Sequence, residues 1–229
     1  MEESLLASVP KAFIPVDASW LLPGQLSMLS EQPPVYLIRD FLDAPSCLSI
    51  IEQTRGAMVP APVVGAAQGE LSEARSSTTC YLRRADMSGI CGKISRLLCG
   101  KDISHMELPQ VGSYESGQEY RAHYDAFNLA DKDGLRFAHN GGQRVATVLV
   151  YLNTVTEGGE THFPRLHLRV HPEQGSALLF FPASLDGVLD EDALHAALPC
   201  GAAPKHVVQV WVRQGAYDGV HNVELAQPL

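Results

Sequence analysis

Two residues of metal-ligand type, His123 and Asp125, lie two positions apart in the segment 120–125. If this segment is a β-strand, its side chains alternate between faces, so the two point to the same side and can share an ion. In a helix they would lie about 200° apart and could not share one, so the metal site depends on the strand. Taken alone, the pair also fits an ordinary polar strand face.

A third ligand has to come from elsewhere in the chain, and His195 is the best candidate because it opens an expected strand. Two histidines and one carboxylate with open coordination positions form the ligand set of non-haem Fe(II) oxygenases. Ten positions later, Lys205 precedes an apolar strand, and the turn at 199–204 predicts a hairpin that brings Lys205 beside the metal. One Fe(II), one carboxylate ligand, a dianionic 2-oxo diacid and one ammonium sum to zero charge, as a partly buried site requires.

The elements that must position these residues are mostly short strands. From about residue 103 onward, runs of Val, Leu, Tyr and Phe alternate with clusters of Gly, Pro and Asn. This spacing predicts a sandwich or double-sheet jelly roll, mainly β with flanking helices. Strands are expected at 118–125, 144–152, 166–170, 177–181, 194–198 and 206–212. A polar loop is expected at 126–143.

The N-terminal half predicts a strand at 35–38, a helix capped by Asp43 that closes at Gly56, and a second helix from Asp86 as N-cap to about Cys99. Residues 60–71, rich in Pro, Ala and Gly, are expected to form a mobile surface loop. Residues 1–34 are expected to be an extension that packs on a catalytic domain spanning residues 35–222.

The composition indicates one globular domain, with 229 residues of which 45% are hydrophobic and 19% charged. The 26 acidic and 17 basic residues give a net charge of −9, which argues against nucleic acid or an anionic membrane as partner. No apolar run approaches the roughly 18 residues of a membrane helix, and the first residues lack the basic start of a secretory signal, so we expect a cytoplasmic protein. The five scattered cysteines suggest neither a disulfide framework nor a zinc site.

Several ordered motifs carry a resemblance to a known family. The matching stretches are residues 114–125, residues 141–152, Gly158-Gly159-Glu160-Thr161 with Phe163-Pro164, and Leu194-His195 through Lys205 to Trp211. Arg75-Ser76-Ser77 is similar to the family's short Arg-Thr-Ser-like run. The similarity covers about residues 35 to 215, and over it the chain resembles the prolyl 4-hydroxylase branch of the 2-oxoglutarate- and Fe(II)-dependent dioxygenases.

The resemblance implies an oxidoreductase with a double-stranded β-helix fold and supporting helices outside it. Iron is implied to be held by three ligands, His123, Asp125 and His195. The far carboxylate of 2-oxoglutarate is implied to be held by Tyr114, Thr161 and Lys205. The implied reaction is the oxidative decarboxylation of 2-oxoglutarate to succinate and CO2, coupled to hydroxylation of a C–H bond by O2, with ascorbate as reductant.

In peptide-hydroxylating members of the family, three side chains meet the substrate, and their counterparts here are Tyr120, Arg144 and Trp211. The resemblance therefore favours a prolyl 4-hydroxylase acting on peptidyl proline, with residues 60–71 and 126–142 as walls of the substrate site. The chain departs from the family at Lys205-His206, where the family often has Lys-Trp, so the packing around the 2-oxoglutarate tail differs.

Two alternatives stay open at this point. One is a hydroxylase of a free amino acid or small metabolite on the same fold. The other is a catalytically silent jelly-roll sensor module, against which the presence of all three iron ligands and Lys205 argues.

Overall fold

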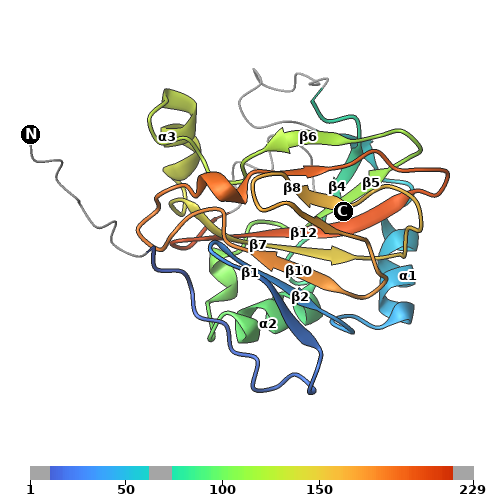
Figure 1. Cartoon of the computed structure of the whole chain (residues 1–229), viewed down its shortest axis with the longest axis horizontal. Helices are drawn as coiled ribbons and strands as arrows, with labels where there is room; N and C mark the ends of the chain where they lie inside the picture. Colours follow the sequence, from blue (N-terminus) through green and yellow to red (C-terminus); the bar gives the residue numbers. More distant parts are fainter. Residues whose placement is uncertain (1–10, 62–73, 219–229) are drawn as a thin grey trace, which may run out of the picture.

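The computed structural model describes residues 11–61 and 74–218, and its strands form two facing sheets (Figure 1). The larger sheet contains, in spatial order, β1 (Leu26–Glu31), β2 (Pro34–Ile38), β10 (Ala177–Phe180), β7 (Arg144–Tyr151), β12 (Lys205–Arg213), β5 (Gln110–Tyr114), β4 (Thr78–Tyr81) and β3 (Val59–Pro60). The smaller sheet contains β6 (Tyr120–His123), β11 (His195–Ala197), β8 (Thr161–Phe163) and β9 (Leu168–Val170). All neighbouring strands are antiparallel. This is the jelly-roll form of the double-stranded β-helix that the sequence predicts.

The larger sheet is buried on both faces, which explains why its central strands are nearly continuous runs of apolar residues. On β7, Val148 and Val150 pack into the outer core, whereas Leu149 and Tyr151 pack into the core between the sheets. The same period of two along β12 directs Lys205 and every second residue after it toward the smaller sheet. Polar residues of β7 and β12 that face inward therefore meet the smaller sheet across the interior of the jelly roll.

Two helices cover the outer face of the larger sheet (Figure 1). Helix α1 (Ala44–Thr54) contributes Cys47 and Ile50 to the outer core, and helix α2 (Ser88–Leu97) contributes Ile94 and its neighbours. Short 3-10 turns lie at Ile103–His105 and Glu191–Ala193. None of the helices within the described ranges has the length and apolar character needed to cross a membrane.

Most of the predicted elements are confirmed. The strands expected at 35–38, 144–152, 177–181 and 206–212 are β2, β7, β10 and β12. Those expected at 118–125, 166–170 and 194–198 are shorter in the structure, as β6, β9 and β11. Helix α1 begins after Asp43, whose Oδ1 accepts a hydrogen bond from the backbone N–H of Ser46 at 2.8 Å.

The predicted hairpin across residues 199–204 is wrong. Strand β11 pairs with β6 and β8 in the smaller sheet, whereas β12 pairs with β5 and β7 in the larger one. A strand of nine residues that is buried almost throughout needs partners on both edges, and β5 and β7 supply them. The turn therefore carries the chain from one sheet to the other.

Two local predictions are also corrected. The expected polar loop at 126–143 contains helix α3 (Lys132–Ala138), which is capped by Asp131 through a 2.6 Å hydrogen bond from the N–H of Gly134. Helix α2 is not capped by Asp86, because that carboxylate pairs with Arg83 at 2.7 Å and Met87 is the N-cap residue. A charge-assisted bond to arginine replaces the backbone cap at this position.

Part of the expected N-terminal extension belongs to the main sheet. Leu26–Glu31 forms β1 at the edge of that sheet and pairs with β2, and Ile14 is buried in the outer core. The division at residue 34 stays a prediction. Most of the expected loop at 60–71 and the end of the expected domain at 219–222 lie outside the described residues.

The turn at Gly158 offers a test of how tightly the two sheets are joined. Gly158 has φ +68°, forms a β-bridge with Cys200, and leaves no room for a Cβ, which would lie 2.3 Å from the carbonyl oxygen of Pro199. We expect Gly158→Ala to destabilise the protein by at least about 2 kcal/mol, because it adds this clash to the cost of a left-handed backbone. Gly24→Ala is the matched control, since Gly24 has φ +84° but open space around it. Urea unfolding of both variants measures the difference, and equal losses would contradict the clash.

Candidate active site

Three side chains of metal-ligand type converge between the two sheets. His123, the last residue of β6, pairs directly with His195, the first residue of β11. Asp125 lies just beyond the end of β6, so the strand is shorter than predicted, but the carboxylate still reaches the two imidazoles. Their potential ligand atoms all lie within 4.8 Å of one another, and residues 11–61 and 74–218 hold no other such cluster of three.

The histidine tautomers fit a metal site. The Nδ1 atoms of His123 and His195 lie 2.8 Å and 3.0 Å from the backbone carbonyl oxygens of Arg121 and Ala193. A carbonyl only accepts, so each Nδ1 carries the proton and each Nε2 has its lone pair free. The buried Nε2 of His123 has no hydrogen-bond partner, which is what a ligand atom facing an ion site shows. The three residues therefore fit a divalent cation such as Fe(II).

The carboxylate between the histidines is oriented and ionised. The hydroxyl of Thr147 donates to Asp125 Oδ2 at 2.8 Å, and the Nε2 atoms of His123 and His195 each lie 3.6 Å from an oxygen of that carboxylate. Burial opposes ionisation of Asp125, but His195 and His123 in their protonated forms, together with the guanidinium of Arg144, hold its pKa well below its usual range. Burial lowers the pKa of His195 to about 4, so its imidazole is neutral near pH 7, as a ligand must be.

A stack of three side chains supports the first ligand. The ring of Tyr120 lies on the imidazole of His123, with ring centroids 3.6 Å apart and planes 15° from parallel. The guanidinium of Arg75 lies 4.9 Å from the centroid of the Tyr120 ring. Burial raises the pKa of Tyr120 to about 12, so its phenol is protonated. The stack restrains the ring of the ligand that the fold leaves most exposed to solvent.

A cavity connects the candidate ligands to a buried ammonium. Lys205 is 2% exposed, donates to the carbonyl oxygen of Gly159 at 2.8 Å and lies 4.7 Å from the centroid of the Tyr114 ring. The hydroxyl groups of Thr161 and Tyr151 are 2.8 Å apart. The cavity is lined by Tyr114, Tyr120, His123, Leu149, Tyr151, Thr161, His195, Ala196, Ala197, Lys205, Val207 and Gln209. All three residues predicted to hold a carboxylate thus face the same cavity as the two histidines.

The three residues predicted to meet the substrate are not equally placed. Tyr120 lines the cavity, whereas Arg144 and Trp211 lie together, with the guanidinium 3.9 Å from the indole centroid. Arg144 is buried, and its Nε and Nη2 donate to Glu107 at 2.6 and 2.8 Å. Its Nη1 makes only a long contact of 3.4 Å with the carbonyl oxygen of Asp125. Most of the hydrogen-bond donors of Arg144 are therefore already used within the protein, and a substrate role for Arg144 stays a prediction.

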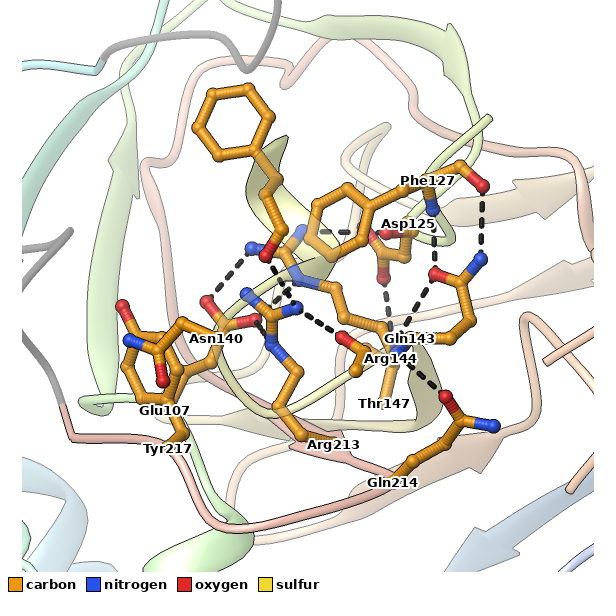
Figure 2. Close-up of polar contacts among 12 residues, drawn as sticks. Glu107, Asp125, Phe127, Asn140, Gln143, Arg144, Thr147, Arg213, Gln214 and Tyr217 are labelled. Atoms are coloured by element: carbon orange, nitrogen blue, oxygen red, sulfur yellow. Dashed lines mark hydrogen bonds and ion pairs between the residues drawn. The ribbon is translucent and has the colours of Figure 1, made fainter. Parts of the chain in front are cut away.

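Glu107 sits at the centre of a buried ionic cluster (Figure 2). Its carboxylate, 1% exposed, pairs with Arg144 and also with Arg213 Nε at 2.6 Å. Burial opposes the ionised form of Glu107, but the two guanidinium groups hold its pKa below its usual range. Together with Asp125, the cluster has two negative and two positive charges, so it is neutral.

Aromatic rings lie against both guanidinium groups. Arg144 contacts the rings of Trp211 and Phe127, and Arg213 contacts those of Phe127 and Tyr217. Arg213 also donates from Nη1 to the carbonyl oxygens of Gly142 and Phe137, at 2.6 and 3.2 Å. The cluster thus ties the α3 segment to the last strand, next to the candidate ligands (Figure 2).

Sequence reasoning missed Thr147, Glu107 and Gln209. Thr147 had a signal, because it is a hydroxyl residue at an inward-facing position of an apolar strand, in step with Leu149 and Tyr151. Gln209 had the same kind of signal on β12. Glu107 had none, because its partners are distant in the sequence and only the folded sheet brings them together.

Comparisons with known proteins agree with this geometry. Residues 109–213 match the family model of the 2OG-Fe(II) oxygenase superfamily. The chain is 33% identical over 214 residues to a probable prolyl 4-hydroxylase 3 and 30% identical over 213 residues to a probable prolyl 4-hydroxylase 6, both of Arabidopsis thaliana. Each alignment covers 83% of this chain and 72% of the relative. A viral collagen prolyl hydroxylase from Paramecium Bursaria Chlorella virus-1, solved as a 2OG complex, is 27% identical, with a TM-score of 0.63, over 78% of this chain and 95% of the viral one.

The buried ammonium predicts a pH dependence. Burial lowers the pKa of Lys205 to about 8, so the group is charged below that pH and increasingly neutral above it. We therefore expect the affinity for a ligand with a free carboxylate, tested with 2-oxoglutarate, to be constant below pH 8 and to fall as pH rises further. Lys205→Arg is the control, since guanidinium stays charged and its own pH profile should be flat. Titration on both sides of pH 8 measures this, and the same decline in both proteins would place the titrating group elsewhere.

The ionic cluster predicts a large stability effect. Glu107→Gln keeps the shape of the side chain but removes the carboxylate that both buried guanidinium groups pair with and leaves Asp125 as the one remaining counter-charge of the cluster, so we expect a loss of about 3–5 kcal/mol. Glu52→Gln is the matched control, because Glu52 pairs with Arg55 at 2.6 Å but both side chains are more than half exposed, and its loss should stay below about 1 kcal/mol. Chemical denaturation compares the two, and similar small losses would show that Glu107 is not essential to charge balance.

Proposed function

The chain belongs to the 2-oxoglutarate- and Fe(II)-dependent oxygenases, in their prolyl 4-hydroxylase-like group, and from this we propose that it hydroxylates proline residues in peptides. It is a 2-oxoglutarate-dependent dioxygenase. The observation that carries the proposal is the His123–Asp125–His195 cluster, whose two histidines line a cavity together with the buried Lys205. The named relatives are prolyl 4-hydroxylases, and they do not favour a small-metabolite hydroxylase or a silent sensor module.

The candidate ligands are prepared for the metal before it binds. His123, Asp125 and His195 would hold Fe(II), with the imidazole of His195 neutral and the carboxylate of Asp125 ionised. Bound Fe(II), with 2-oxoglutarate and O2, supplies the oxidising power that inserts oxygen into a C–H bond while 2-oxoglutarate becomes succinate and CO2. The rings of Phe163 and Phe180 pack around His195 and exclude water from that side.

One wall of the cavity is complementary to the cosubstrate. Lys205 offers an ammonium at the closed end of the cavity, and Thr161 and Tyr114 lie beside it. The far carboxylate of 2-oxoglutarate would pair with this ammonium, which has no ion-pair partner among the described residues. A charge-assisted bond in a site shielded from water fixes the position of the diacid, so that its reacting end is held near the ligand cluster.

Aromatic surfaces suit the proposed proline substrate. The ring of Tyr120 stacks on His123, and Trp211 pairs on the sheet with Thr147, whose hydroxyl holds Asp125, so both aromatic residues lie beside the ligand cluster, and aromatic side chains bind a proline ring well. The indole N–H of Trp211 is buried and has no hydrogen-bond partner. We propose that it donates to a carbonyl group of the bound peptide.

Two finer proposals rest on the sequence alone. Ascorbate as the reductant follows from the family resemblance, and no described residue is assigned to it. A cytoplasmic location is proposed from the composition of the sequence. Both stay predictions.

A substrate screen tests the proposed function. The Fe(II)-loaded protein is incubated with 2-oxoglutarate and either proline-containing peptides or free amino acids, and mass spectrometry reads the gain of one oxygen. We expect the gain in peptides and its loss in Asp125→Ala, which removes the only anionic candidate ligand. Gain only in a free amino acid would overturn the peptide assignment. Retained turnover in Asp125→Ala would overturn the metal assignment.

A substitution of Trp211 should affect peptide hydroxylation and peptide-independent decarboxylation differently. Trp211→Ala removes the proposed contact with the substrate but leaves the cavity around Lys205 intact, so peptide hydroxylation should fall much more than slow decarboxylation of 2-oxoglutarate without peptide. Succinate and hydroxyproline are measured on one preparation to obtain both rates. Equal loss of the two activities would place Trp211 in the support of the metal site.

A further inference from the structure

Gln209 carries a buried carboxamide that nothing in the described chain explains. It lies in the middle of β12, is 7% exposed and lines the cavity shared by the candidate ligands and Lys205. Its side chain makes no hydrogen bond within residues 11–61 and 74–218. The amide atoms are not among the fully buried unpartnered ones, so the carboxamide faces the cavity and is open to a molecule that enters it.

The neighbouring glutamine shows the contrast. Gln110 stands directly beside Gln209 in the pairing of β5 with β12. Its Oε1 accepts from Arg75 at 2.8 Å and its Nε2 donates to the hydroxyl of Tyr81 at 2.6 Å. Of two glutamines at the same level of the sheet, one is satisfied by the protein at both ends, and the other is left with both ends free.

The position of Gln209 along β12 indicates which part of a ligand it meets. Two residues toward the C-terminus, Trp211 pairs with Thr147, whose hydroxyl holds Asp125. Lys205 lies four residues before Gln209, about 13 Å away along the strand. Gln209 is thus next to the metal-ligand end of the cavity, and the ammonium is at the opposite end.

We propose that Gln209 binds the cosubstrate: its carboxamide donates a hydrogen bond to the C1 carboxylate of 2-oxoglutarate. The ammonium of Lys205 binds the far carboxylate, so the 2-oxo acid end of the diacid extends toward the metal ligands and toward Gln209. This inference rests on the proposed function only in requiring 2-oxoglutarate as the cosubstrate. It does not depend on the identity of the hydroxylated substrate.

The test compares 2-oxoglutarate with succinate, two ligands that have the far carboxylate in common. Succinate keeps the far carboxylate of 2-oxoglutarate but lacks the C1 carboxylate. Both are titrated against the Fe(II)-loaded full chain without oxygen, so that binding is read without turnover, in the wild type, Gln209→Leu and Gln209→Met. Leucine and methionine match the size of glutamine and cannot donate a hydrogen bond.

We expect both variants to bind 2-oxoglutarate about 10- to 100-fold more weakly, the range for loss of one hydrogen bond to a charged group, and succinate within about twofold of the wild type. Lys205→Ala is the control for the other end, and it should weaken both ligands. The melting temperature of Gln209→Leu should stay close to that of the wild type, because the described protein makes no hydrogen bond to this amide that the change would remove. Methionine provides a second variant should leucine disturb folding.

Three results would overturn the proposal. Equal weakening of both ligands would show that Gln209 acts on the shape of the cavity. Unchanged binding of 2-oxoglutarate with a raised KM for peptide would place the amide on the peptide substrate. A lower melting temperature in both variants would give Gln209 a structural role. The titrations need no peptide, so a negative peptide screen would not change their result, and each proposal can be wrong without the other.

Discussion

Charge balance in a region shielded from water is the constraint on which the rest of the site depends. Glu107 and Asp125 bring two carboxylates into the interior, and Arg144 and Arg213 bring two guanidinium groups. A buried charge without a partner costs several kcal/mol, so these four groups have to lie together. That requirement fixes where β7 and β12 stand relative to the loop that carries Asp125. Lys205 has no ion-pair partner among the described residues, so its charge is available to an anionic ligand.

Because side chains alternate between the two faces of a strand, the strands held by this charge balance also bring the residues of the site together on one face. On β12, one face packs against the helices with Val208 and Val210, and the other presents Lys205, Gln209 and Trp211 in a row. These three side chains span the interior from the closed end of the cavity to the ionic cluster. A single strand therefore provides contacts for the cosubstrate and, under the proposed function, for the substrate.

The sequence was informative where the chemistry lies in residue type and short-range spacing. The ligand pair His123 and Asp125, the distant His195 and the lysine at Lys205 were all identifiable, because their order matches a known family and the strand period predicts a shared face. The path of the chain after His195 was not predictable, because a turn with Pro and Gly fits a hairpin and a crossing between sheets equally well. Only the competition among strands for partners decides between them.

The neutrality of the ionic cluster without any metal has a consequence for the life of the protein in the cell. Thr147 and the cluster already satisfy Asp125, and backbone carbonyl oxygens already orient the Nδ1 atoms of both ligand histidines. The fold therefore has no need of iron for its stability, in contrast to small zinc domains that unfold when the metal leaves. Loss of iron would thus leave a folded, inactive chain that lacks only the stability contributed by metal binding, and resupply of iron would restore activity without new synthesis.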